Sequence, residues 1–90
     1  MNRTADTETG FSIDGSGPPV VLVHGMGLNR AMWQGMLPPL AARFTVIRYD
    51  LLGHGESAAP PLPCTLGDLV AQLDALLSRL EISRTAIVGF

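Results

Sequence analysis

The fold is decided by residues 20–27, which read VVLVHGMG. The first four residues are aliphatic and three of them are valines, a run typical of a strand buried on both faces of a parallel sheet. The run ends in a loop that holds one histidine and two glycines. Because ligand sites of open α/β sheets gather beyond the carboxyl ends of the strands, this loop is the first candidate for a functional site.

Further strands and helices are expected on both sides of this segment. Two more apolar stretches resemble strands, and leucines recur at helical spacing after Thr65, which forms a capping-box pattern with Asp68. Pro38 and Pro39 fit only the start of a helix, so we expect a turn over residues 31–35 and a short helix over 39–42. The expected elements are strands at about 11–14, 20–24, 45–50 and 85–90 and helices at about 31–42 and 65–81.

These elements predict an α/β fold with a mostly parallel sheet, because buried strands that alternate with helices form parallel sheets with crossover helices. Residues 1–90 are expected to form a single partial domain, with a loosely ordered lead-in over residues 1–10. The 47% share of hydrophobic residues is high for 90 residues. Such an excess is expected of part of a larger domain, in which further chain covers the apolar surface.

Charge and cysteine content narrow the classes of protein. The formal net charge is −2 and the six basic residues are spread along the chain, so a basic stripe for binding nucleic acid is missing. Cys64 is the single cysteine, which fits a reducing compartment. The first ten residues lack the apolar stretch of a signal peptide, and no later run is long enough to cross a membrane. We therefore expect a cytoplasmic protein without a nucleic-acid or membrane partner.

Motif-like residues stand at the ends of the three buried strands. Residues 24–27 read HGMG, residues 50–57 read DLLGHGES, and the last strand runs into Gly89 and Phe90. Acyl-transfer enzymes aim backbone N–H groups at the oxygen that becomes an anion in the tetrahedral intermediate, and glycines leave such groups unobstructed. Taken alone, residues 24–27 fit a plain glycine-rich turn equally well. The three segments together are far more specific.

Together these segments resemble the α/β-hydrolase family over most of the chain from Val20 onward. Residues 24–27 are similar to the HG-x-G loop of that family, and residues 50–57 match its D-x-R-G-x-G-x-S segment, except that Leu52 replaces the common arginine. Gly89 and Phe90 resemble the beginning of the nucleophile elbow, G-x-S-x-G. Within the family, residues 48–57 are most similar to enol-lactonases and haloperoxidase-like esterases.

The resemblance implies a role for each motif. The backbone N–H of Met26 would be an oxyanion-hole donor, and the nucleophile would follow Phe90. Since the triad of this family runs serine, acid, histidine along the chain, His24, His54 and Asp50 come too early to belong to it. We expect them to make structural hydrogen bonds, and we expect no nucleophile, triad acid, triad base or metal site within residues 1–90. The residues expected to support the motifs are His24, Gly25, Gly27, Asp50, Gly53, Gly55 and Ser57, with Gly89 and Phe90 opening the elbow.

The implied parent protein is a serine-type hydrolase of carboxylic esters or lactones that works through an acyl-enzyme and needs no cofactor. Its substrate would be a small ester or lactone. An aspartate nucleophile, as in the related dehalogenases, stays an alternative because the deciding residue would follow Phe90. The 90-residue chain by itself is expected to be inactive.

Two readings from other classes compete with this one. Gly25 and Gly27 after a strand, with Asp50 after the next strand, also fit a dinucleotide-binding domain. Against it, Arg30 stands at the third glycine position, and two prolines interrupt the helix that would hold the pyrophosphate. A non-catalytic ligand-binding or protein-interaction module is the other alternative, and in it the last strand would leave an open sheet edge.

Overall fold

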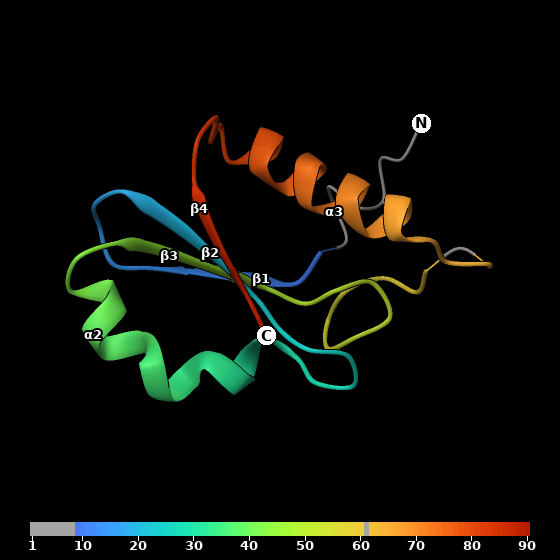
Figure 1. The fold of residues 1–90 in the computed structure, drawn as a ribbon, viewed down its shortest axis with the longest axis horizontal. Coiled ribbons are helices and arrows are strands. Elements are labelled where there is room, and N and C mark those ends of the chain that lie inside the picture. The colour runs from blue at the N-terminus through green and yellow to red at the C-terminus, as the bar shows by residue number, and fades with distance from the viewer. Residues whose placement is uncertain (1–8, 61) are drawn as a thin grey trace.

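The computed structural model describes residues 9–60 and 62–90, over which strands and helical segments alternate (Figure 1). The strands are β1 (Phe11–Asp14), β2 (Pro19–Val23), β3 (Thr45–Tyr49) and β4 (Ala86–Gly89). The helical segments are the 3-10 helix η1 (Arg30–Met36) and the α-helices α2 (Leu37–Ala41) and α3 (Leu66–Arg79). Each predicted strand is present, with ends that lie within one residue of the prediction.

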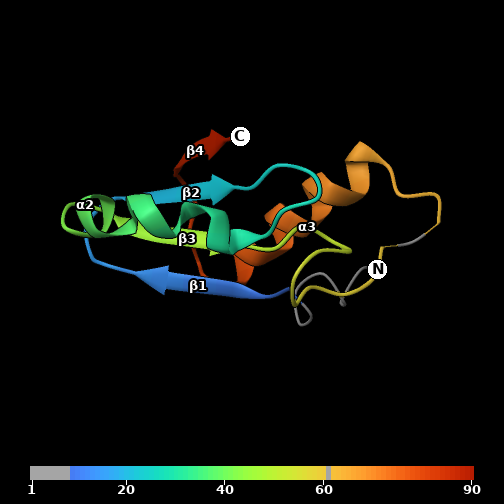
Figure 2. The same cartoon turned by 90° about the horizontal axis from the view of Figure 1, so that it is seen from below.

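The strands form one sheet in the order β1-β3-β2-β4. Strand β2 runs parallel to β3 and to β4, whereas β1 runs antiparallel to β3. Figure 2 looks onto one face of this sheet, with η1 and α2 in front and α3 behind. The predicted α/β fold with a mostly parallel sheet is therefore confirmed.

Side chains that alternate along β2 and β3 build an apolar core on each face of the sheet. On one face, Val21 and Ile47 pack with Leu76 of α3, and all three are fully buried. On the other face, Leu22 of β2 packs with Trp33 of η1. Because helices cover both faces, β2 is apolar along its whole length, and β3 is apolar except at Thr45 and Arg48.

Helix α3 begins and faces the sheet as its sequence predicts. The Thr65 hydroxyl accepts a hydrogen bond from the Asp68 N–H (3.2 Å), and the Asp68 carboxylate accepts one from the Thr65 N–H (2.8 Å), which completes the capping box. The helix has 14 residues. Within the described part of the chain, no helix has the length and hydrophobicity that crossing a bilayer requires.

The helical region before β3 differs in detail from the prediction. Residues predicted as a turn form the 3-10 helix η1, whose first N–H groups are capped by the Asn29 side chain (Asn29 Oδ1 to Ala31 N, 2.9 Å). Helix α2 begins at Leu37 and not at Pro39, so that Pro38 and Pro39 both lie in its first turn. Residues in a first helical turn have no intrahelical acceptor for their N–H, so prolines there forfeit no hydrogen bond.

The last two residues of the predicted lead-in contact the loop that follows β3. Thr9 is buried, and the Gly10 carbonyl accepts a hydrogen bond from the Asp50 N–H (2.9 Å). These two residues are tied to the loop that follows β3, in continuation of the pairing between β1 and β3. Residues 1–8 of the predicted lead-in lie outside the described residues.

The carboxyl ends of β2, β3 and β4 meet at one edge of the sheet, because Val23 of β2 pairs with both Tyr49 and Gly89. Beyond β4, the Phe90 N–H donates to the Val23 carbonyl (3.1 Å). The three motifs are thereby brought together, as parallel pairing of the three strands requires.

Candidate active site

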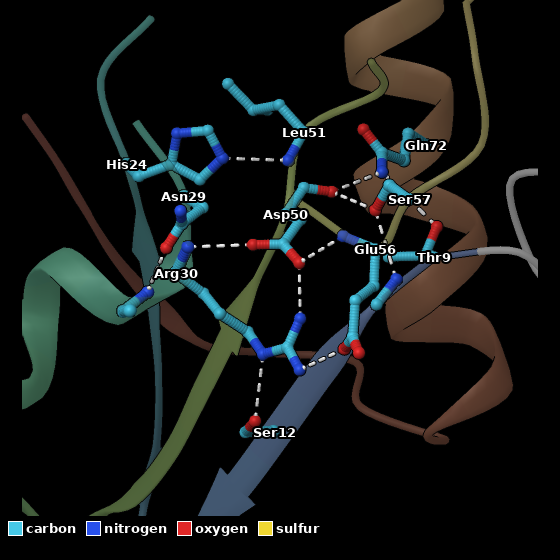
Figure 3. A network of polar contacts seen from close by, with 12 residues as sticks. Thr9, Ser12, His24, Asn29, Arg30, Asp50, Leu51, Glu56, Ser57 and Gln72 are labelled. Carbon is cyan, nitrogen blue, oxygen red and sulfur yellow. Dashed lines mark hydrogen bonds and ion pairs between the residues drawn. The ribbon is translucent and has the colours of Figure 1, made fainter. Parts of the chain in front are cut away.

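Two loops form the candidate site. The β2 loop is residues 24–29, and the β3 loop is residues 50–58; both leave the carboxyl edge of the sheet (Figures 1 and 3). The end of β4 lies beside the β2 loop, where the Phe90 ring lies against Gly25. A Cβ atom at position 25 would be only 2.7 Å from the Phe90 ring, so the glycine permits the close approach of these two segments.

The β2 loop makes a tight turn with Met26 at its tip. The Gly25 carbonyl accepts a hydrogen bond from the Leu28 N–H (3.1 Å), and Gly27 has a φ of 82°. A turn with this bond and a positive φ at its third residue is of the type II class, which favours glycine there. Met26 is 73% exposed, and among the described residues no hydrogen bond to its N–H is found. The N–H predicted to be an oxyanion donor is therefore free to meet a ligand.

His24 links the two loops from inside the protein. It is buried, and its Nε2 accepts a hydrogen bond from the Leu51 N–H (3.0 Å). Since a backbone N–H can only donate, Nε2 is unprotonated, and the proton of the neutral ring is on Nδ1, which donates to the Gly25 carbonyl (2.8 Å). Both ring nitrogens of His24 are thus hydrogen-bonded to the backbone of the two loops.

His54 makes the converse link. It belongs to the β3 loop, and its Nε2 accepts a hydrogen bond from the Gly27 N–H of the β2 loop (3.1 Å). Its Nδ1 lies 3.0 Å from the Leu52 carbonyl, to which it donates. The centroids of the His24 and His54 rings are 5.0 Å apart.

Asp50 organises the β3 loop with both its side chain and its backbone (Figure 3). One carboxylate oxygen accepts from the Arg30 N–H (2.7 Å), and the other accepts from the Glu56 N–H (3.0 Å) and from the Arg30 guanidinium. Burial by itself would raise the pKa of this carboxyl, but the two N–H groups and the positive charge of Arg30 hold the pKa below its ordinary value. Asp50 is thus an ionised structural acceptor at neutral pH.

Arg30 connects three segments through one guanidinium. It pairs with Asp50, donates to the Glu56 carboxylate (2.6 Å) and donates from Nε to the Ser12 hydroxyl of β1 (3.0 Å). The hydrogen bond to Glu56 contributes most to raising the pKa of Arg30. In a dinucleotide-binding domain the acid after the second strand must be open to a ribose, whereas here Arg30 occupies it. This observation counts against the dinucleotide-binding alternative.

The glycines and the serine of the β3 loop allow the loop to wrap closely around Asp50. Gly53 and Gly55 have φ values of 79° and 49°, and a Cβ atom at Gly55 would collide with the Asp50 carboxylate. The Ser57 hydroxyl donates to the Asp50 carbonyl and accepts from the Gly10 N–H (3.0 Å). Ser57 therefore has its hydroxyl engaged in the loop and is not placed as a nucleophile.

Gln72 of α3 is a residue of the site that sequence reasoning missed. It is fully buried; its Oε1 accepts from the Leu52 N–H (3.0 Å), and its Nε2 donates to the Asp50 carbonyl (2.9 Å) and to the Thr9 hydroxyl (3.3 Å). One signal was available, because position 72 falls on the leucine-lined face of α3, where a polar side chain needs a buried partner.

The described residues hold no group of three or more histidine, cysteine, aspartate or glutamate side chains that could bind a metal ion. What the two loops do present at the carboxyl edge is a turn held from both sides, with the exposed residue Met26 at its tip, whose N–H makes no hydrogen bond within the described part of the chain. A donor of this kind suits the stabilisation of an oxyanion.

Comparison with known proteins agrees with this geometry. A family model described as "alpha/beta hydrolase fold" matches residues 18–90. An uncharacterised protein of Mycobacterium tuberculosis is 47% identical over 79 residues, which make up 88% of this chain and 23% of that protein.

Two solved structures are also similar. The enol-lactonase from Burkholderia xenovorans has 34% identity and a TM-score of 0.87, over 91% of this chain and 33% of that one. A thermophilic esterase from Thermogutta terrifontis has 35% identity and a TM-score of 0.85, over 91% of this chain and 30% of that one. The chain thus spans about a quarter to a third of the length of these relatives. With its sheet order, its two loops and these matches, the chain belongs to the α/β-hydrolase family.

Proposed function

We propose that this chain forms the N-terminal part of a serine-type hydrolase of carboxylic esters or lactones, in which the Met26 N–H is one donor of the oxyanion hole. The observation that carries the proposal is the Met26 N–H at the tip of the β2 loop turn: Met26 is 73% exposed, and none of the residues that the structure describes accepts a hydrogen bond from this N–H. The turn lies at the carboxyl edge of a parallel sheet, where this fold class places its chemistry.

The strand register supports a nucleophile beside this donor. Gly89 pairs with Val23, and Phe90 lies against Gly25. A serine directly after Phe90 would therefore stand next to the β2 loop. Such a serine would attack the substrate carbonyl carbon, and the carbonyl oxygen would take the negative charge and accept a hydrogen bond from Met26. Expulsion of the alcohol would leave an acyl-enzyme, which water then hydrolyses.

The substrate class is supported by the names of two similar proteins, an enol-lactonase and an esterase. Both names denote the cleavage of an ester bond, cyclic or open. The histidine that acts as the catalytic base would have to come from chain beyond Phe90. Both histidines of residues 1–90 have their Nε2 occupied by backbone N–H groups. For this reason the 90-residue chain alone is proposed to be inactive.

The donor role is tested by replacing Met26 with proline in the hydrolase that carries this segment ahead of its nucleophile. Proline is favoured at the second position of a type II turn, so Met26→Pro removes the N–H and keeps the turn. We expect kcat for an activated ester to fall by about 100- to 1000-fold, the usual effect of losing one oxyanion donor. Met26→Leu is the matched control and should keep the rate. Equal rates for the two variants would refute the role of this N–H.

The inactivity of the short chain has a separate test. Purified residues 1–90 should hydrolyse p-nitrophenyl acetate no faster than the buffer does. The residue after Phe90 in the coding sequence then decides the nucleophile, because serine supports an esterase, whereas aspartate would point to dehalogenase-type chemistry.

A further inference from the structure

We propose that His54 is a positioning residue for the oxyanion donor: from the β3 loop it holds the β2 loop turn in the orientation that presents the Met26 N–H. This inference rests on the proposed function, and it gives the β3 loop a part in that function beside the β2 loop. The observation behind it is the hydrogen bond from the Gly27 N–H to His54 Nε2 (3.1 Å).

The bond acts on the peptide group that is most free to move. In a four-residue turn the central peptide, here between Met26 and Gly27, can flip by half a turn and thereby interconvert turn classes I and II. Gly27, with a φ of 82°, has no side chain to resist such a flip, and apart from its two chain neighbours no described residue has an atom within 4 Å of the place where its Cβ would be. The flip would point the Gly27 N–H away from His54, so the hydrogen bond opposes it.

The other side of Met26 is held by His24. The Gly25 carbonyl accepts from both the Leu28 N–H (3.1 Å) and His24 Nδ1 (2.8 Å). This carbonyl belongs to the peptide group that carries the Met26 N–H, and in a trans peptide the two point in opposite directions. The peptide groups on both sides of Met26 are thus fixed by histidines, one from each loop.

The arrangement is reciprocal. The Nε2 of His24 accepts from Leu51 in the β3 loop, while the Nε2 of His54 accepts from Gly27 in the β2 loop. Each imidazole also donates from Nδ1 to a carbonyl of its own loop, which holds the ring. Neither loop can shift along the other without breaking at least one of these bonds.

A fixed orientation matters because an oxyanion donor contributes only when it is aimed at the developing charge. Preorganised donors lie 2.7–3.1 Å from the oxyanion, and a misplacement of about 1 Å can lower a rate by about 100-fold. The turn is exposed at Met26, Gly27 and Leu28. With so little packing around it, hydrogen bonds must provide the rigidity.

The test uses the hydrolase that carries this segment and compares three variants. In His54→Ala the acceptor for the Gly27 N–H is lost. In His54→Asn the side chain is too short for its oxygen to reach the Gly27 N–H. His54→Gln places an amide oxygen near the position of Nε2. We expect kcat to fall by about 10- to 100-fold in the alanine and asparagine variants with KM changed by less than about threefold, and the glutamine variant to recover most of kcat.

Two further measurements separate the proposal from simpler explanations. Hydrogen exchange at the Gly27 amide should speed up in His54→Ala and stay slow in His54→Gln, whether or not the protein is an esterase. Asp74→Asn, at an exposed position of α3 outside both loops, serves as a control and should leave both the exchange at Gly27 and kcat unchanged. If the unaltered protein hydrolyses no ester, the proposed function fails while the exchange data still report the bond. If exchange speeds up in His54→Ala and kcat stays the same, the positioning role is overturned.

Discussion

At the scale of single residues, the site depends on side chains whose hydrogen-bonding atoms are all occupied. The Asp50 carboxylate accepts from two backbone N–H groups and the Arg30 guanidinium, and the carbonyl of the same residue accepts from Gln72 and Ser57. Buried acceptors satisfied in this way fix one loop conformation, since any other conformation would leave a buried polar group without a partner.

The lowered pKa of Asp50 makes part of the stability depend on pH. A carboxyl with a folded-state pKa below its unfolded value stabilises the fold above the unfolded pKa, about 3.9 for aspartate, and loses that contribution as the pH falls through the folded-state value. We expect Asp50→Asn to lower the free energy of unfolding by about 2 kcal/mol at pH 7. The difference from the unaltered protein should shrink below about pH 4, as measured by urea denaturation at a series of pH values.

The control for this experiment is Asp74→Asn, at an exposed position of α3. It should leave the pH dependence unchanged. A constant difference between Asp50→Asn and the unaltered protein from pH 7 down to pH 3 would contradict the ion-pair account of Asp50.

Gln72 provides a second prediction at this scale. Gln72→Leu keeps the volume but leaves the Leu52 N–H and the Asp50 carbonyl with fewer partners inside the protein. Since each unsatisfied buried group costs about 1–3 kcal/mol, we expect a loss of about 2–4 kcal/mol in the free energy of unfolding. Val70→Ala, at an exposed position of the same helix, is the control and should change it by less than about 0.5 kcal/mol. Similar losses in both variants would rule out a special role of the amide.

At the scale of elements, α3 ends in a conformation that its sequence does not favour. The Ile82 N–H donates to the Leu77 carbonyl (2.9 Å) and the Glu81 N–H to the Ser78 carbonyl (3.1 Å), which is the pattern of a Schellman motif. Glu81 occupies the left-handed position of this motif, with a φ of 59°. Glycine is the usual residue there, because a Cβ atom makes this conformation costly.

We therefore expect Glu81→Gly to raise the free energy of unfolding by about 0.5–1 kcal/mol, as seen by thermal or urea denaturation. Glu81→Ala keeps a Cβ atom and should give no such gain. Equal stability of the glycine and alanine variants would show that the left-handed conformation carries no cost at this position.

Elements were more predictable than the contacts between them. The strand over residues 20–23 and the cap at Thr65 follow from local patterns, and the structure has both. The ion pair between Arg30 and Asp50 joins the start of η1 to the β3 loop, and their distance depends on how β2 and β3 pair, so no local pattern encodes it. The helical region predicted over residues 31–42 is present as η1 and α2, but its 3-10 part was not foreseen, because glycine and proline near residues 35–39 predict an interruption without saying which helical form precedes it.

At the scale of the whole molecule, the edge strand β4 of the sheet is poorly covered by other elements. Strand β4 is exposed along its length, with Ile87 55% exposed, and Phe90 just beyond its end is 81% exposed. Leu66 and Val70 of α3 are exposed as well. An apolar edge strand of this kind can pair with another chain.

We expect the isolated 90-residue chain to self-associate as its concentration rises, and sedimentation velocity to show it. Ile87→Lys should reduce the association, because a charge on an edge strand opposes pairing. Ala71→Lys adds the same charge at an exposed position of α3 and should have a smaller effect. If both lysine variants remain monomeric to the same extent, net charge and not the edge strand governs the association.

The order of the strands also bears on the route by which the chain folds. Strands β1, β3 and β2 are neighbours in the sheet and lie within residues 11–49. Strand β4 also pairs with β2, but it follows α3 in the sequence and is therefore far from β2 along the chain. Contacts between residues close in sequence form faster, so we expect a three-stranded intermediate that awaits β4, both during refolding and as the chain leaves the ribosome. Pulse-labelling hydrogen exchange should then show early protection at Ile47 and late protection at Val88. The hydrogen bonds that hold the loop carrying Met26 lie within residues 24–54, whereas Phe90 reaches Gly25 only with β4. The donor turn would therefore form first, and the strand that leads to the proposed nucleophile would be added to it afterwards.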